Sequence, residues 1–290
     1  PLLFSIEMDY IMRKVTSTKH GITWNLFNTL EDLDYADDIC LIASSFADMS
    51  AKLAKLEEEA LTIGLKINIR KTKSMRIGTT TTQKFRVRGE DIDEVDDFCY
   101  LGSPITKDGG TTADVLNRIN KANQAFGALN NIWRSTHLAL STKLRIFSTN
   151  VLPILLYGCE TWKSTTIIDS KLQVFVNKCL RKILRIFWPQ RISNVELLAR
   201  TGRKPVVEEV KRRKWKWIGH VLRSDNKITK EVLDWNPHGS RGRGRPKLSW
   251  RRTVLKELEL FGSSWKEIKA LAPNRVRWRS FVDALCSLKE

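Results

Sequence analysis

The sequence predicts an α+β fold in which antiparallel strands, with helices on one face, are followed by a mostly α-helical part. Three observations predict it. Up to about residue 110, short apolar runs are separated by turns rich in Thr, Gly and Asp, which is typical of strands. After Gly109-Gly110, apolar residues recur at three- and four-residue steps, which is typical of helices. The charge changes at the same place, because residues 1–110 carry 14 Lys/Arg and 18 Asp/Glu, whereas residues 111–290 carry 36 and 14.

Composition bounds the class of protein. At 290 residues and 42% hydrophobic content, the chain is long and apolar enough for one large domain or two ordinary ones. Its net charge of +18 favours a polyanionic partner, with nucleic acid first among the choices. Five scattered cysteines form no zinc-binding spacing and favour a reducing compartment without disulfides. The longest apolar run, Val151–Tyr157, is too short to span a membrane.

The first predicted elements lie before residue 102. Apolar residues between Phe4 and Met12 suit a helix packed on a sheet, and a hairpin follows. From Phe46 to Ile63 apolar residues recur on one face of an amphipathic helix. Ser44 or Ser45 can cap its start, and Gly64 can end it. Short strands are expected around residues 74–77, 84–88 and 98–101, with a loop over residues 79–82.

Long helices are predicted in the second part. One apolar stripe runs from Val115 to Trp133 and another from Leu172 to Ile183. Capping boxes start at Ser193 and Ser264, because Glu follows each serine at the third position. The remaining signals are a helix end at Gly202, a helix start at Pro205, a flexible basic linker over His238–Lys247, and final helices over Trp250–Phe261 and Ser264–Ser287.

The acidic turn Tyr35-Ala36-Asp37-Asp38 is the most informative stretch. An apolar run follows it, so the sequence predicts a tight hairpin beside buried strands. Two adjacent carboxylates there need a compensating cation, and oxygen-only ligands favour Mg²⁺ or Mn²⁺ over zinc. The alternative is a solvated turn, because Asp is a favoured turn residue in any case.

Several further motifs occur in a fixed order with this turn. They are Pro1–Asp9, Tyr35–Asp38, Gly64–Lys73 (GLKIN followed by KTK), Phe98–Gly102 (FCYLG), Ile218–Arg223 (IGHVLR), Arg243–Lys247 (RGRPK) and Trp278-Arg279. In this order they resemble the carboxyl-terminal part of the reverse transcriptase of a LINE-type (non-LTR) retrotransposon, part of an endonuclease-reverse transcriptase polyprotein. Each motif is weak alone, and the ordered set covers essentially the whole chain.

The resemblance implies an architecture and an activity. The activity is that of an RNA-directed DNA polymerase, which extends a template-bound primer by two-metal nucleotidyl transfer. The implied partners are an RNA template, a DNA primer or target and dNTPs, with no membrane, in the nucleus and cytoplasm. The implied domains are a truncated reverse-transcriptase palm over residues 1–110, thumb-like helices over 111–160, a basic helical region over 161–237, a Gly/Arg/Pro linker over 238–248, and C-terminal helices over 249–290.

The resemblance also assigns residue roles. Asp37 would be a direct metal ligand and Asp38 a second or supporting one, while Tyr35 and Ala36 would shape the turn and contact the primer end. Lys71 or Lys73 would reach the triphosphate or protonate the leaving pyrophosphate, unless both belong to a solvated basic turn. The primer-grip motif, which would hold the primer terminus or form an ordinary buried strand, consists of Phe98, Cys99, Tyr100, Leu101 and Gly102.

One departure from the family concerns catalysis. A polymerase of this type needs another Asp from an earlier palm strand, and that strand, the fingers and the endonuclease domain are expected upstream of residue 1. We therefore expect this chain alone not to polymerise. The alternative is a non-enzymatic RNA- or DNA-binding remnant of a retroelement.

Basic clusters in the second part are candidate nucleic-acid contacts. On one predicted helix Trp215 and Trp217 would mark the buried side, and the alternative for the cations is a solvated face. The basic linker resembles a minor-groove-binding AT-hook core. Most tryptophans are expected to be core anchors rather than base-stacking residues, and His220 a structural histidine. The candidate contacts are Lys211, Arg212, Arg213, Lys214, Lys216, Arg241, Arg243, Arg245 and Lys247.

Overall fold

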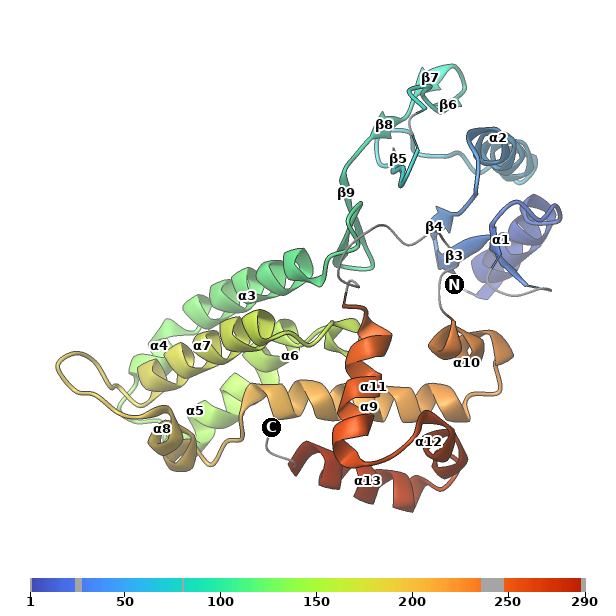
Figure 1. The fold of residues 1–290 in the computed structure, drawn as a ribbon. Helices are drawn as coiled ribbons and strands as arrows, with labels where there is room; N and C mark the ends of the chain where they lie inside the picture. The colour runs from blue at the N-terminus through green and yellow to red at the C-terminus, as the bar shows by residue number, and fades with distance from the viewer. Residues whose placement is uncertain (1, 24–27, 80, 236–247, 288–290) are drawn as a thin grey trace. The chain divides into compact units, whose positions relative to one another are not determined.

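The structure is a computed structural model that describes residues 2–23, 28–79, 81–235 and 248–287. The described residues form two compact units (Figure 1). Unit 1 comprises those up to Gly110 together with Trp235, and unit 2 comprises those from Thr111 to Asp234 and from Leu248 onward. Unit 1 thus ends where the sequence changes its hydrophobic period.

Unit 1 begins with a helix that packs on a second helix. The predicted first helix is confirmed as α1, whose Ile11, Met12 and Val15 are buried in a small core with Leu56. Ile6, by contrast, is exposed. The first elements are α1 (Leu2–Val15), β1 (Ile22–Thr23), β2 (Thr29–Leu30), β3 (Asp32–Tyr35), β4 (Asp38–Leu41) and α2 (Phe46–Thr62).

The second helix has the predicted ends. The Ser45 side chain caps α2 by accepting a hydrogen bond from the Asp48 backbone N–H. Gly64 follows its last turn with φ of +78°, a conformation that glycine adopts without strain. The helix buries Leu53 in a second small core with Phe85, Val87 and Ile92.

The strands of unit 1 are short and pair two by two. The antiparallel pairing that the sequence predicts holds for four of the five pairs, and β5 with β8 is parallel. Within the described residues no wider sheet joins these pairs. The remaining strands are β5 (Lys73–Ser74), β6 (Arg86–Val87), β7 (Glu90–Asp91), β8 (Asp93–Glu94), β9 (Asp97–Tyr100) and β10 (Ser103–Thr106).

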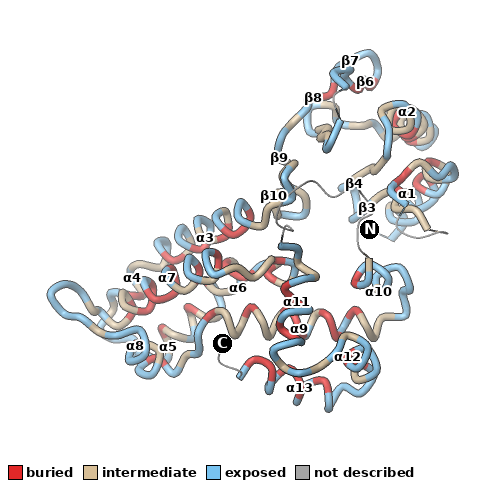
Figure 2. The backbone as a smooth tube through the Cα atoms, viewed as in Figure 1, coloured by how far each residue is buried: buried red, intermediate tan, exposed pale blue. Residues whose placement is uncertain are grey.

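Unit 2 is helical and contains two hydrophobic cores. The first core collects buried residues between Val115 and Val210, and therefore runs across residue 160 without a break. Figure 2 shows buried positions recurring along α3 and α7. The elements of this core are α3 (Thr111–Ala128), α4 (Asn130–Arg134), α5 (Leu140–Ile146), α6 (Leu152–Leu155), a 3₁₀ turn (Cys159–Thr161), α7 (Thr166–Ile183), α8 (Asn194–Thr201) and α9 (Val206–Arg223).

The second core of unit 2 surrounds Trp215. It joins the carboxyl-terminal half of α9 to the last helices, and Trp278 and Phe281 pack against the Trp215 ring. The predicted capping box at Ser264 and the helix end at Gly202 are confirmed. At Ser193 the serine caps the helix, but the Glu196 side chain pairs with Arg200, so only half of the predicted box is present. The elements are α10 (Lys227–Asp234), α11 (Trp250–Phe261), α12 (Trp265–Leu271) and α13 (Arg275–Ser287).

Two predicted helices are interrupted. The stripe from Val115 to Trp133 is divided at Leu129 between α3 and α4, and the helix predicted over Ser264–Ser287 is divided into α12 and α13. In the second case Pro273 explains the break, since proline has no N–H to donate within a helix. The apolar residues of α3 and α4 still share the first core, and those of α12 and α13 share the second.

A π turn over Phe147–Val151 connects α5 to α6 directly. The Leu152 N–H donates to the Phe147 carbonyl, five residues back. Two side chains of this turn donate hydrogen bonds to backbone carbonyls of the preceding turn. The Ser148 hydroxyl donates to the Leu144 oxygen at 2.6 Å, and the Asn150 amide donates to the Ile146 oxygen at 3.1 Å. Phe147 and Val151 are nevertheless fully buried, so the wide turn belongs to the core.

Tryptophans occupy both cores, as expected. Trp133, Trp162, Trp215 and Trp278 are buried, and among the described tryptophans Trp188 alone is exposed. Three cysteines are also buried, and burial raises the pKa of the Cys179 thiol to about 12. No helix in the described part of the chain is long and apolar enough to cross a membrane.

Candidate acidic site

The predicted hairpin is formed by β3 and β4. Leu33 pairs with Cys40 and Tyr35 with Asp38, which leaves Ala36 and Asp37 as a two-residue connection. Ala36 has φ of +55°, as the first central residue of the turns that join antiparallel strands so tightly. A non-glycine residue in that conformation is strained by about 1 kcal/mol. The turn therefore holds Asp37 and Asp38 at the tip of a fixed hairpin.

The tip carboxylates are exposed, and so is Tyr35. The expectation of a buried strand is wrong here, since Leu33 is 45% exposed and β4 is half-buried. The reason is that no further strand is hydrogen-bonded to either edge of this pair in the described residues. The described residues also contain no group of three or more His, Cys, Asp or Glu side chains placed to hold a metal ion. Asp37 and Asp38 offer carboxylate oxygens suited to a hard cation, but two carboxylates alone do not fill its coordination shell.

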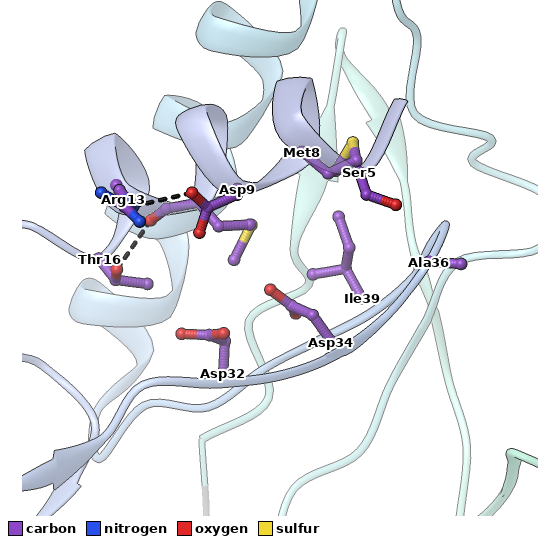
Figure 3. A pocket seen from close by; sticks show the side chains of 10 residues that line it. Ser5, Met8, Asp9, Arg13, Thr16, Asp32, Asp34, Ala36 and Ile39 are labelled. Atoms are coloured by element: carbon purple, nitrogen blue, oxygen red, sulfur yellow. Dashed lines mark hydrogen bonds and ion pairs between the residues drawn. The ribbon is translucent and has the colours of Figure 1, made fainter. Parts of the chain in front are cut away.

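A pocket of about 300 Å³ lies between α1 and the β3–β4 hairpin. Figure 3 shows the side chains of Asp32 and Asp34 on the same side of β3, with Asp9 of α1 above them. Asp9 forms an ion pair of 2.9 Å with Arg13, one helical turn along. Sequence reasoning missed this pocket. The available signal was the spacing of Asp32 and Asp34, because residues two apart on a strand share a face.

Asp34 has the most perturbed carboxyl of the site. Its pKa is raised to about 7, first by the burial of its carboxyl group and then by a hydrogen bond with Asp32 and the charge of Asp32, although the residue as a whole is exposed. Burial and the same two carboxylates also raise the pKa of the Cys40 thiol. The Asp34 carboxyl therefore keeps its proton to a higher pH than an ordinary aspartate does.

The second predicted motif lies against the acidic hairpin. The Tyr100 hydroxyl donates to the Leu33 carbonyl at 2.7 Å. Burial raises the pKa of Tyr100, with Cys40, Asp34 and Asp38 adding to the shift. In this second hairpin Leu101 and Gly102 form the two-residue connection between β9 and β10, and both have positive φ. Phe98 and Tyr100 are half-buried, and Cys99 is exposed, so the alternative of an ordinary buried strand is not what the structure contains.

The candidate lysines follow α2 and are placed differently from each other. Lys71 is exposed in a turn in which its backbone N–H donates to the Asn68 side-chain oxygen at 3.2 Å. Lys73 lies on β5 and forms a 2.6 Å ion pair with Asp93 of β8. The turn that the sequence allowed as an alternative is therefore present at Lys71.

A buried ion pair that sequence reasoning missed holds the base of the acidic hairpin. The Lys52 ammonium of α2 pairs with the Glu31 carboxylate and donates to the Ile42 carbonyl at 2.6 Å. Burial alone would raise the pKa of Glu31, but hydrogen bonds from Lys52, Thr29 and the backbone at Gly21 and His20 lower it to about 2. Glu31 and Ile42 directly flank β3 and β4, so this clamp fixes both strands to α2.

The predicted basic patch on α9 is largely engaged within unit 2. Lys214 is fully buried and pairs with Glu257 at 2.5 Å, so its assignment as a nucleic-acid contact is wrong. Glu257 also accepts a 2.6 Å hydrogen bond from the Trp215 indole, which satisfies both carboxylate oxygens. Arg213 pairs with Glu209 at 3.0 Å, and Arg212 pairs with Asp283.

The other cations divide between exposed and undescribed positions. Lys211 is half-buried, whereas Lys216 and His220 are exposed. The predicted linker contacts Arg241, Arg243, Arg245 and Lys247 lie outside the described residues. Trp217 is half-buried and its ring lies edge-on to Trp250 at 5.9 Å, in agreement with the expected core role.

Comparisons with known proteins give a coarse origin. A Caenorhabditis elegans protein named "Putative uncharacterized transposon-derived protein" is 26% identical over 268 residues, which cover 87% of this chain and 95% of that protein. A family model described as a domain of unknown function (DUF6451) matches residues 125–157. The first likeness indicates a transposon-related origin for the chain. The second covers the end of α3 through α6 and names no activity.

Proposed function

We propose that this chain is the carboxyl-terminal portion of a non-LTR retrotransposon reverse transcriptase, with a palm-derived unit 1 and a nucleic-acid-binding unit 2. The activity would be RNA-directed DNA synthesis on an RNA template from a DNA primer. The transposon-related origin supports the proposal at the level of the element but not at the level of the reaction.

One observation carries the proposal. The hairpins that carry two of the motifs, more than sixty residues apart, meet in unit 1 through the Tyr100 hydroxyl and the Leu33 carbonyl. In a polymerase of the resembled family, the first motif would position the metal and the second the primer terminus. Contact between the two hairpins is what that division of labour requires, because the primer 3′-hydroxyl must reach the metal-binding carboxylates.

The acidic tip suits one part of the chemistry. Asp37 and Asp38 would hold Mg²⁺ or Mn²⁺ through oxygen donors, and that ion would supply charge stabilisation during nucleotidyl transfer. The chain itself contributes a rigid hairpin and, in Tyr100, a fixed contact with the neighbouring one. Since two carboxylates are too few for a full cage, we propose that a third ligand comes from outside the described residues.

The metal assignment can be tested without synthesis. With added hydrogen peroxide, which oxidises Fe²⁺ to Fe³⁺ and yields hydroxide and a hydroxyl radical, Fe²⁺ substituted for Mg²⁺ would cleave a bound RNA–DNA hybrid close to the metal. We expect cleavage at the recessed primer end, and its loss in Asp37→Asn and Asp38→Asn. Glu90→Gln, an exposed carboxylate on β7 of the same unit, is the matched control. Cleavage that is unchanged in both aspartate variants would overturn the assignment.

Primer extension tests the expected inactivity of the chain alone. With template, primer, dNTPs and Mg²⁺ we expect no Asp37-dependent synthesis, because the metal cage is incomplete. Robust synthesis that Asp37→Asn abolishes would show that the chain already contains a complete site.

A non-enzymatic nucleic-acid-binding remnant is the second candidate. The observation that favours it is the charge of residues 111–290, which carry 36 Lys/Arg against 14 Asp/Glu. This candidate predicts that affinity for RNA or DNA falls steeply with salt and that Asp37→Asn leaves it unchanged. A flat salt dependence would contradict nucleic-acid binding in both candidates.

A further inference from the structure

The loop between α7 and α8 has an exposed aromatic tip. Phe187 is 59% exposed and Trp188 is 77% exposed, whereas Trp133 and Trp215 in the cores are at most 1% exposed. An isolated exposed leucine needs no explanation, but two adjacent large aromatic side chains leave a substantial apolar surface in water. The tip therefore calls for an explanation other than core packing.

The loop is held in place by its own bonds. The Gln190 N–H donates to the Phe187 carbonyl at 2.8 Å. This bond closes a turn whose two central residues are Trp188 and Pro189. Leu184 and Ile192, on either side, pack on the first core of unit 2. These contacts fix both ends of the loop while its tip stays outside the core (Figure 1).

A side chain of α7 also fastens the far end of the loop. The Arg181 guanidinium donates to the Asn194 side-chain oxygen at 2.6 Å and to the Ile192 carbonyl at 3.4 Å. The aromatic rings are thus presented by a fixed frame, and little conformational entropy is lost if they bind a partner.

A cation lies at the tip, and further cations continue from it along α7. The Arg191 guanidinium lies 5.0 Å from the centroid of the Trp188 ring. Lys171, Lys178 and Lys182 are spaced at seven and four residues on α7, so they share one face of that helix. Residues 170–195 contain six Lys/Arg and no Asp or Glu.

We propose that this loop is a stacking platform for the unpaired bases of single-stranded nucleic acid, with Arg191 and the α7 lysines contacting phosphates. Flat rings stack on the face of any base, and nearby cations follow the backbone, which is how strands are bound without sequence preference. A duplex is the poorer partner because its bases are already stacked on each other. This inference rests on the proposed function, to which it adds the binding element and the class of nucleic acid.

Anisotropy with the full chain tests the platform. The probe is a fluorescein-labelled 12-nucleotide oligo(U), and the variants are Trp188→Ala, Trp188→Leu and Trp188→Phe. We expect affinity to fall roughly tenfold for Ala and Leu, because each removes the stacking ring, and to stay within about threefold for Phe. Val276→Ala, which truncates a residue of α13 that is 76% exposed, is the matched control and should bind as the wild type does.

The leucine variant separates stacking from apolar docking. If Trp188→Leu binds oligo(U) as tightly as the wild type, the ring does not stack and the proposal is overturned. If the wild-type chain binds anionic vesicles and not oligo(U), the tip serves a membrane. If Trp188→Ala abolishes a self-association of the chain that light scattering detects, the tip binds a second copy of the chain. Both results would also overturn it.

An RNA–DNA hybrid as a second probe distinguishes the two levels of inference. Loss of oligo(U) binding in Trp188→Ala with retained hybrid binding supports the platform. If every Trp188 variant binds both the hybrid and oligo(U) as tightly as the wild type does, the platform is overturned and the proposed function still stands. Absence of hybrid binding by the wild-type chain contradicts the proposed function itself.

Discussion

Both units bury a lysine–glutamate ion pair, but they surround it differently. In unit 2 Lys214 and Glu257 lie beside a core of thirteen buried residues that includes Trp215. In unit 1 Lys52 and Glu31 lie beside two cores of four buried residues each. Unit 2 is therefore held chiefly by apolar burial, whereas unit 1 depends more on its polar clamp.

The difference explains how an acidic hairpin is kept accessible. A pair of strands with one small core behind it leaves its tip and much of its face in solvent. The clamp on Glu31 and Lys52 fixes the base of the hairpin without covering the tip. Rigidity in unit 1 thus comes from a few hydrogen bonds at one end of the strands.

The largest expected effect tests apolar burial in unit 2. Trp215→Ala removes a fully buried ring and leaves Glu257 without the indole donor, so we expect a loss of about 4 kcal/mol. Hydrogen exchange read by mass spectrometry should show lost protection in α9, α11 and α13. Val276→Ala, at an exposed position, should change nothing. Full protection of these helices in Trp215→Ala would contradict the view that unit 2 is held chiefly by apolar burial.

The clamp in unit 1 comes next. Lys52→Met keeps the aliphatic volume but leaves the Glu31 carboxylate buried without its cation, and we expect a loss of about 3 kcal/mol. Exchange should rise in β3, β4 and α2 and stay unchanged in unit 2. Lys55→Met, which removes a neighbouring lysine whose ammonium donates to the Ser17 hydroxyl, provides the control. An unchanged β3–β4 hairpin would mean that the small cores suffice.

A glycine on α9 gives a sharper test of packing. A Cβ at Gly219 would lie 2.2 Å from the Trp278 indole nitrogen, which donates to the Trp215 carbonyl at 3.2 Å. Gly219→Ala gains about 1 kcal/mol in helix propensity but forces Trp278 to move, so we expect a net loss of about 2 kcal/mol. Urea unfolding followed by circular dichroism measures it. A net gain in stability would show that α13 can shift freely against α9.

The smallest expected effect concerns the acidic pair of unit 1. A carboxyl whose pKa is raised to about 7 in the folded chain stabilises the fold fully below its unfolded pKa near 4, and that stability is lost as pH rises through 7. Asp34→Asn mimics the protonated form, so it should match the wild type at pH 4. At pH 8 it should be more stable by about 1 kcal/mol, a value that allows for solvent screening.

Melting temperatures at the two pH values measure this difference. Glu90→Gln, an exposed carboxylate in unit 1, should show no gain at pH 8. Equal stability of Asp34→Asn and the wild type at pH 8 would show that solvent screens the Asp34 and Asp32 carboxylates from each other.

The sequence was most informative where the physics is local. The caps at Ser45, Ser193 and Ser264 and the helix end at Gly202 depend on residues within one turn, and all were predicted. The tight hairpin at Ala36 likewise follows from nearby residues. The broken helix at Pro273 was missed, although proline itself was a local signal against a continuous helix.

Features that depend on tertiary contacts could not be predicted in the same way. The charge pattern of α9 does not reveal that Glu257, 43 residues further on, binds Lys214 in the interior. In unit 1, likewise, no local pattern in the sequence reveals that Lys52 reaches Glu31, or that Asp32 and Asp34 face Asp9 across a pocket. Each requires knowledge of which elements are neighbours in space.

The π turn at Phe147–Val151 has a consequence for the length of the chain. Each hydrogen bond of a π turn spans five residues along the chain, one more than in an α-helix. Removal of one residue there would restore α-helical spacing as far as Pro153, and Leu155 would still face the core. The segment that matches the family model spans this turn, so a gap of one position inside this helix is structurally admissible when relatives are aligned.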